Sequence, residues 1–230
     1  CLFINRDLFA RYNVKVPRTY DDLKQAVTDF RKNGVIPIAY NSTAEGTYLY
    51  QNIVARLGGK ENVERPFVNG VPNKCYVEAM EYVRELYQMG AFPPDAFNLS
   101  SRERDELFIT KKAAMIVQGS WFIGRFSDSD TTVDIVPFPY IREGVTSETA
   151  LIYGFGCGTF YMSKSAWDDE TRKNASIKLL KALTSIESAE IFAKRTGMLS
   201  NVDSERLNSY QGRLRVNEKA LLNAADELIG

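Results

Sequence analysis

The sequence contains no histidine, and its three cysteines, Cys1, Cys75 and Cys157, lie far apart. Without an imidazole there is no Ser-His-Asp triad, no Cys-His pair and no histidine ligand for zinc. No Cys-x-x-Cys motif occurs, and an odd number of cysteines does not suit a disulfide framework. We therefore expect no hydrolytic triad, no metal or redox centre and no cofactor.

An excess of charge of one sign is also missing, as are long apolar runs. Lysine and arginine together number 29, and so do aspartate and glutamate, which gives a net charge of zero. This balance creates no overall field for nucleic acid or for an anionic membrane. No apolar run approaches the ~20 residues that cross a bilayer. Leu-Phe-Ile directly after Cys1 favours a strand there over a lipid-modified tether.

What the sequence does have is an alternation of short apolar strands and amphipathic helices. Thr19 and Asp22 suit a helix start, and apolar residues from Leu23 to Phe30 recur at helical spacing. Strands are predicted at 2–4, 35–40, 113–117 and 133–140, a polar loop at 60–73, and helices at 20–33, 47–57, 76–89, 101–110, 168–184, 185–194 and within 201–230. This alternation indicates an α/β fold.

The end of the strand at 113–117 raises a specific question. It stops at Gln118-Gly119-Ser120, and Trp121, one of only two tryptophans, follows at once. The indole either packs in the core or lines a cleft at the edge where the strands end, which is where open α/β folds hold small ligands.

Three segments, taken in order, share motifs with a known family. Residues 2–27 combine a strand ending in Asn with an Arg-Asp-Leu-Phe turn and a Val-Pro-x-Thr helix start. Residues 107–121 match Phe-x-x-Gly-Lys-Ala-Ala-Met followed by Gly-x-Trp, with Lys111 at the usual glycine. Residues 153–202 match a crossing strand, a helix pair and a closing Gly-x-x-Pro, with Ser200 at the usual proline. Together they resemble the family 1 extracellular solute-binding proteins, the sugar-binding components of ABC importers.

The resemblance implies a type II periplasmic-binding-protein-like fold of two lobes, in a chain of nearly double this length. Residues 1–149 then correspond to a complete second lobe and 150–154 to the hinge crossing. Residues 155–200 correspond to a helix-pair remnant of the first lobe, and 201–230 to a helical tail. We expect most of the first lobe to be missing from this chain, so that the 155–200 helices lack their usual sheet partners.

The resemblance also implies a function. Similar proteins capture a carbohydrate, expected here to be an oligosaccharide, in the periplasm or at the outer face of the cell membrane. They deliver it to the permease subunits of an ABC transporter by closing the two lobes around it. A lipid anchor would belong to the missing N-terminal part, and no enzymatic activity is expected.

The alternative class is a glycoside hydrolase, which uses paired carboxylates. Its candidates are the acidic groups ERDE at 103–106 and DDE at 168–170. Both groups lie at predicted helix starts, where negative charge offsets the helix dipole without any catalytic role.

Two aromatic residues are candidate ligand contacts. An indole face removes roughly 100 Å² of a pyranose from water, or about 2.5 kcal/mol. Micromolar binding needs about 8 kcal/mol, so a platform at Trp121 would supply a third of it. The resemblance places a second aromatic contact near Tyr48, in the helix after the loop NSTAEG. Core packing is the alternative for both.

Polar candidates follow the ends of two strands. Asn41 and Glu45 lie in the loop after 35–40, and Gln118 ends 113–117. Their amide and carboxylate groups suit sugar hydroxyls, most strongly at the charged Glu45. Asn41 also suits plain turn chemistry.

A glycine-broken run, YGFGCG, completes the candidates. Gly154 and Gly156 suit a hinge, because glycine tolerates backbone changes that other residues resist. The run lacks the remainder of a dinucleotide-binding fingerprint. Tyr153 beside it is expected to face the cleft.

Overall fold

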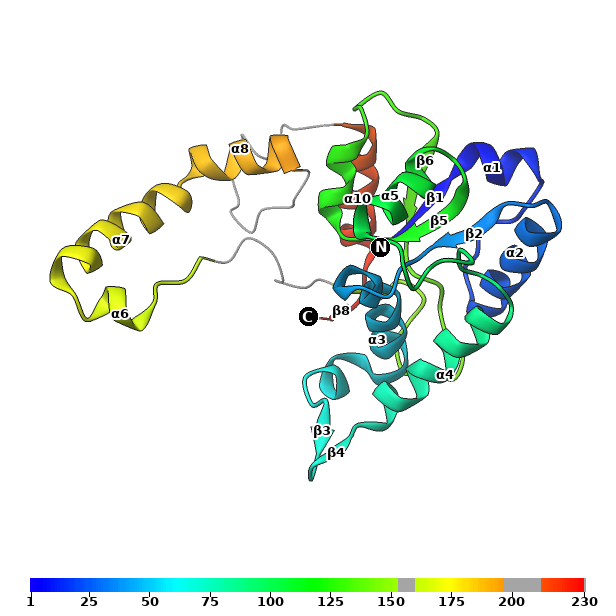
Figure 1. Ribbon diagram of the computed structural model, residues 1–230, viewed down its shortest axis with the longest axis horizontal. Coiled ribbons are helices and arrows are strands. Elements are labelled where there is room, and N and C mark those ends of the chain that lie inside the picture. Colours follow the sequence, from blue (N-terminus) through cyan, green and yellow to red (C-terminus); the bar gives the residue numbers. More distant parts are fainter. Residues whose placement is uncertain (153–159, 197–211, 230) are drawn as a thin grey trace.

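The computed structural model describes residues 1–152, 160–196 and 212–229 and contains a four-stranded mixed sheet (Figure 1). Its strands are β1 (Leu2–Asn5), β2 (Ile36–Ala39), β5 (Ala113–Val117) and β6 (Val133–Val136), in the order β2-β5-β1-β6. β2 and β5 are parallel, whereas β1 is antiparallel to β5 and β6. The α/β class and all four predicted strands are confirmed, although β6 stops at Val136, where prolines begin.

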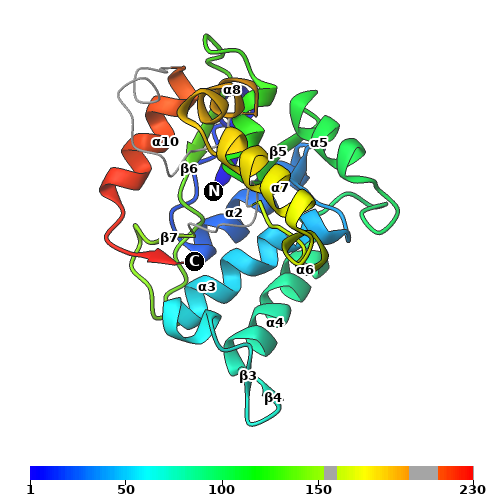
Figure 2. The ribbon, with the colours of Figure 1, turned by 90° about the vertical axis from the view of Figure 1, so that its left-hand side faces the viewer.

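Helices cover both faces of this sheet because its side chains alternate in direction. Leu2 and Ile4 of β1 pack into one core, and Phe3 between them packs into another. The first core is formed with α1 (Arg6–Arg11), α2 (Tyr20–Lys32), α3 (Thr47–Val63) and α4 (Lys74–Gln88). The second is formed with α5 (Ser101–Ile109), the 3-10 helix η2 (Ser120–Arg125) and α10 (Arg213–Ala224) (Figure 2).

The start of α2 confirms the predicted cap. Thr19 Oγ1 accepts from the Asp22 backbone N–H at 3.1 Å, and Asp22 Oδ2 accepts from the Thr19 N–H at 3.0 Å. This reciprocal pair satisfies two backbone donors at the helix end. The helix then buries Leu23 and Phe30 completely, as their spacing predicts.

The predicted break of the second long helix at Gly58-Gly59 is confirmed, but a further helical turn follows it. α3 kinks at Gly59, whose φ of 61° leaves the helical region, and the helix then resumes to Val63. The predicted polar loop at 60–73 is instead the end of α3 followed by a hairpin of β3 (Phe67–Val68) and β4 (Val71–Pro72). Glycine weakens a helix without always ending it, because tertiary packing can carry the chain through.

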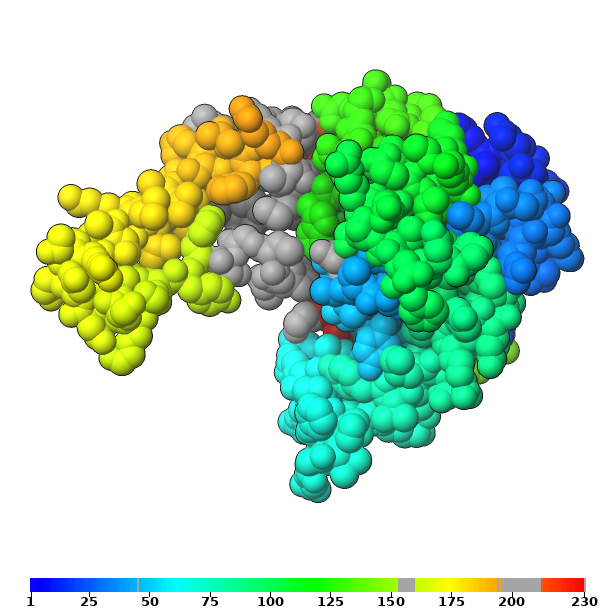
Figure 3. All heavy atoms as spheres, viewed as in Figure 1, coloured from blue at the N-terminus to red at the C-terminus, as the bar shows by residue number. Residues whose placement is uncertain are grey.

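Three helices form an arm that extends from this body. They are α6 (Lys164–Trp167), α7 (Glu170–Leu183) and α8 (Ile186–Thr196), and Asp169 caps α7. The predicted helix 168–184 therefore starts two residues later, after a separate short turn. Figure 3 shows α6 and α7 standing away from the rest of the described chain, whereas α8 contacts η2.

The described part of the predicted C-terminal helical tail contains the helix α10 and folds back onto the sheet. α10 packs against β6, where the Arg213 guanidinium donates to the carbonyls of Asp130 and Val133. β8 (Leu228–Ile229) then pairs in parallel with β7 (Leu151–Ile152) at the predicted crossing. Within the described residues, no helix has the length and apolar character to cross a membrane.

Candidate functional site

The structure answers the question raised by the tryptophan that follows Gly119. The Trp121 ring folds back over this glycine, so that a Cβ at position 119 would lie 2.2 Å from its Cη2 atom. A side chain at position 119 would therefore displace the indole. The ring is half-buried: one part packs on the core cluster that contains Phe122, and another part remains accessible. The two interpretations of Trp121, core packing and exposure at the sheet edge, both hold in part.

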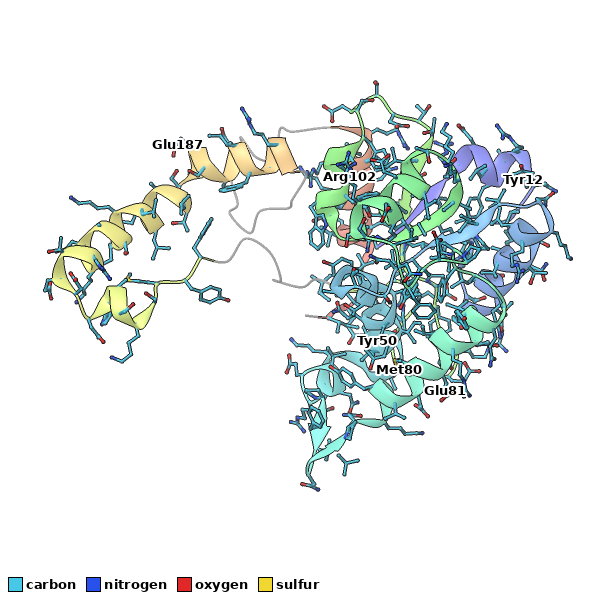
Figure 4. The ribbon with its side chains drawn as sticks, in the orientation of Figure 1. Tyr12, Tyr50, Met80, Glu81, Arg102 and Glu187 are labelled. Carbon is cyan, nitrogen blue, oxygen red and sulfur yellow. The ribbon has the colours of Figure 1, made fainter. Side chains whose placement is uncertain are left out.

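Tyr48 lies beside this indole. The ring centroids of Tyr48 and Trp121 are 5.7 Å apart with planes at 65°, an edge-to-face pair. Tyr48 stands at the start of α3, after the 3-10 turn η1 (Ala44–Gly46), and Trp121 stands just after β5. The parallel pairing of β2 and β5 brings the two segments to one edge of the sheet. Tyr50, two residues on, turns away and donates to Tyr76 O of α4 at 2.8 Å (Figure 4).

Asn41 is fully buried and forms only internal hydrogen bonds. Its amide group donates to Thr43 Oγ1 at 2.8 Å and to Leu99 O at 3.2 Å. Its Oδ1 accepts from Arg104 Nη1 at 3.3 Å, and the residue is 0% exposed. This geometry gives Asn41 an internal structural role instead of the direct ligand contact predicted from the sequence.

Gln118 is likewise buried at the end of β5. Its Nε2 donates to Asp105 Oδ1 at 3.1 Å, and its Oε1 accepts from the Gly119 N–H at 3.3 Å. The side chain therefore fixes the backbone that carries the indole and does not itself face a ligand. As with Asn41, the sequence identified the right edge of the sheet but not the direction of the amide.

The centre of this network is an arginine that the sequence analysis missed. Arg104 is only 2% exposed and donates from Nε and Nη2 to Asp105 Oδ1, at 3.0 and 2.7 Å. The sequence analysis treated ERDE only as charge at a helix start. Arg104 lies four residues before the buried Phe108 on α5, so both are on one face, and this spacing was the signal for its burial.

The other carboxylates of ERDE have structural partners. Glu103 forms a capping box with Ser100, whose backbone N–H and hydroxyl both donate to it and lower its pKa. Glu106 pairs with Arg125 at 3.3 Å. In the acidic group at 168–170, Asp168 pairs with Lys164 and Asp169 caps α7. Helix capping and surface pairing thus account for these four carboxylates, whereas Asp105 belongs to the buried network of Arg104.

Four predicted positions are described only in part or not at all. The backbone of Glu45 forms part of η1, but its side chain lies outside the described residues. Tyr153, Gly154 and Gly156 also lie outside them, so the cleft-facing tyrosine and the hinge glycines stay predictions. The backbone near Glu45 is tightly placed, because a Cβ at Gly46 would lie 1.7 Å from Asn41 O.

The described surface near this edge is shallow. A hollow of about 200 Å³, partly open to solvent, lies where β2 and β5 end, and its lining includes Tyr40, Leu49, Arg104 and Val117. Neither Tyr48 nor Trp121 is part of the lining of this hollow.

A buried arginine ties α3, and with it Tyr48, to the segment before the crossing. Arg56 is buried, and burial lowers its pKa to about 10. Its guanidinium donates to Ser147 O at 2.6 Å and also to the carbonyls of Phe138 and Glu148. Hydroxyls of the same segment bind the Asp226 carboxylate before β8. The approach to the crossing is thus fixed to the body of the lobe.

Comparison with known proteins places this geometry in a family. The profile of the family described as bacterial extracellular solute-binding protein matches residues 1–190. The chain belongs to this family. The galactooligosaccharide-binding protein of Bacillus subtilis (strain 168) is 24% identical over 153 residues, which cover 62% of this chain and 35% of that protein.

Solved structures of solute-binding proteins share the fold. A chitin oligosaccharide binding protein matches with a TM-score of 0.80 and 20% identity, over 99% of this chain and 58% of the other. A Streptococcus pneumoniae solute-binding protein, solved with the blood group A-trisaccharide, matches with a TM-score of 0.74 and 20% identity over the same shares. The chain thus spans little more than half the length of these relatives. Their names describe them as binding proteins.

Proposed function

We propose that this solute-binding family member is one lobe of the carbohydrate-binding component of an ABC importer, and that Trp121 with Tyr48 forms its sugar platform. The observation that carries the proposal is the accessible edge-to-face pair at the end of β2 and β5. The names of the relatives support a carbohydrate ligand, since they mention galactooligosaccharide, chitin oligosaccharide and a trisaccharide. An oligosaccharide is therefore the proposed ligand.

A second wall, which would enclose a sugar stacked on this pair, is proposed to come from the first lobe, most of which corresponds to the part of the relatives that this chain does not span. Its relatives are longer by a large share of their length. The arm also exposes apolar side chains that a folded protein normally covers: Trp167 is 54% exposed, and Leu179 and Ile191 are similarly open (Figure 4). We assign residues 1–149 and the returning segment 213–229 to the second lobe, and the arm to the first.

Capture would then work by hinge closure. A ligand that touches both lobes stabilises the closed state by its higher affinity for that state alone. The Arg56 clamp holds the segment before the crossing, so bending is concentrated beyond Ile152. The closed form would dock on permease subunits in the periplasm or at the outer face of the membrane. A lipid anchor, as in the sequence expectation, would belong to the first lobe.

The free energies of the individual contacts predict how tightly this chain should bind a sugar on its own. A platform worth about 2.5 kcal/mol, with one or two hydrogen bonds of about 1.5 kcal/mol each, gives dissociation constants between about 1 mM and about 0.1 mM. Micromolar binding needs contacts from both lobes. Calorimetry that shows sub-micromolar binding of any oligosaccharide by these 230 residues would contradict the two-lobe proposal.

The test of the platform is an NMR titration with galacto-oligosaccharide, chitin oligosaccharide and maltose. We expect weak, saturable binding that Trp121→Ala abolishes. Trp167→Ala is the matched control, because the second tryptophan lies on the arm and should not affect binding. Equal affinities for wild type and Trp121→Ala would refute the site. Turnover of chromogenic glycosides by the wild-type chain would instead support the hydrolase alternative.

A further inference from the structure

A sugar platform needs a polar group beside it to select among hydroxyl patterns, and both amides expected in that role face inward. We propose that Asp105 is the ligand-hydroxyl acceptor of the Trp121–Tyr48 site and so helps to decide which sugar is bound. This inference rests on the proposed function and adds a residue that the sequence analysis considered only as a hydrolase carboxylate or as charge at a helix start.

The hydrogen bonds of Asp105 are markedly one-sided. Oδ1 accepts from Arg104 Nε, Arg104 Nη2 and Gln118 Nε2, at 3.0, 2.7 and 3.1 Å. Among the residues that the structure describes, none donates to Oδ2, and 14% of the side chain is exposed. A carboxylate has about four acceptor positions, so Oδ2 retains its full capacity for a ligand.

This arrangement differs from that of a purely structural partner. An arginine and a carboxylate that only neutralise each other commonly form two parallel bonds, one to each oxygen. Here both guanidinium donors converge on Oδ1, and the amide of Gln118 joins them there. The pair satisfies the charge of the buried Arg104 and still leaves one carboxylate oxygen unused.

A short series of contacts links Asp105 to the indole. Gln118 bonds Asp105 through Nε2 and the Gly119 N–H through Oε1. Gly119 in turn forms the seat of the Trp121 ring. α5, which carries Asp105, also packs against η2, which carries Trp121: the ring centroids of Phe108 and Phe122 are 6.0 Å apart, and Glu106 pairs with Arg125 at 3.3 Å. A pyranose stacked on the indole can therefore present edge hydroxyls to this carboxylate.

The chemistry of the group defines the ligand class. An ionised carboxylate accepts hydrogen bonds and cannot donate them, so it favours neutral polyhydroxyl ligands and disfavours sugars that carry a carboxylate at the same position. Arg104 and Gln118 hold the group in place before the ligand arrives, and little side-chain freedom is then lost on binding. Hydrogen bonds to charged groups are also the stronger kind.

The test compares Asp105→Asn with Glu106→Gln, a neutralised neighbour on the same helix whose partner is Arg125. Both are made with Trp167→Phe, which leaves Trp121 as the only tryptophan, and are titrated with galacto-oligosaccharide and chitin oligosaccharide. We expect Asp105→Asn to weaken binding about tenfold or more and Glu106→Gln by less than about twofold. Unchanged affinity in Asp105→Asn, with a normal Trp121 response, would overturn this assignment and leave the platform intact. If the Trp167→Phe chain without either second substitution shows no Trp121 response to sugar, both the Asp105 assignment and the Trp121–Tyr48 platform are overturned.

A second measurement does not depend on the variant folding. In wild-type protein labelled with ¹³C, sugar should shift the carboxyl carbon of Asp105 and leave that of Glu106 unchanged. A response at the Trp121 indole without any shift at Asp105 would contradict the proposal. If Asp105 has only a structural role, sugar should change the signal of the Trp121 indole without shifting the carboxyl carbon of Asp105.

Discussion

Gly119→Ala is the substitution that tests the seat of the indole most sharply. The added Cβ would lie 2.2, 2.4 and 2.5 Å from three carbons of the Trp121 ring. Carbon atoms in contact prefer about 3.5–4.0 Å, so the ring must retreat by roughly 1 Å or more. Gly119 has a φ of −82° and a ψ of 171°, which alanine adopts without strain. Gly119→Ala should therefore change the position of the Trp121 indole without straining the backbone.

We expect Gly119→Ala to change the free energy of unfolding little and the affinity for sugar strongly. Loss of the edge-to-face contact with Tyr48 costs about 0.5–1.5 kcal/mol, and alanine recovers about 0.4–1 kcal/mol by restricting the unfolded chain. The free energy of unfolding should thus change by less than about 1 kcal/mol. Loss of the platform should weaken sugar binding by up to about 60-fold.

Fluorescence of Trp121 in a Trp167→Phe background reads out the change. We expect Gly119→Ala to red-shift the emission, to increase quenching by acrylamide and to remove the response to sugar. Ser120→Ala is the control, because it keeps a Cβ already present and should alter none of these. Emission and sugar affinity that are unchanged in Gly119→Ala would show that the ring does not rest on this glycine.

Two further substitutions test features outside the site, both by urea unfolding. Lys111 has a φ of 60°, a backbone conformation that favours glycine, so Lys111→Gly should stabilise by about 0.5 kcal/mol despite loss of the exposed Asp7 ion pair. Lys112→Gly, at a position without positive φ, should destabilise, and equal effects would refute the strain. Arg56→Met leaves buried carbonyls unpaired and should destabilise by about 3 kcal/mol or more, whereas Arg18→Met removes an exposed pair and should cost less than about 0.5 kcal/mol. Similar losses in both arginine variants would contradict the clamp.

Local sequence rules predicted the elements that depend on neighbouring residues. The cap at Thr19, the alternation in β1 and the strand at 113–117 follow from spacing alone. Trp121 is placed at a strand end from the sequence and Tyr48 by the family resemblance, whereas their contact at one edge of the sheet depends on the parallel pairing of β2 and β5. Family resemblance then selected that edge as the candidate site.

The remainder depends on contacts between distant segments. Asn41 faces inward because Arg104, 63 residues away, supplies a buried donor for it. A Cβ at Gly58 of α3 would lie 2.7 Å from Cys75 Sγ of α4, so the need for glycine at this position comes from another helix. The parallel pair of β7 and β8 joins two segments that no local pattern connects. The spacing of residues along the sequence does not show which distant segment an element will contact.

The most direct measurement of the central claim is saturation-transfer NMR between the indole and a bound sugar. Selective saturation of Trp121 protons, in the Trp167→Phe chain, should pass to the C–H protons on one face of a pyranose of galacto-oligosaccharide or chitin oligosaccharide. Transfer confined to one sugar face, and lost in Gly119→Ala, is the result expected of a stacked platform. Sugar binding without any transfer from Trp121 would contradict it.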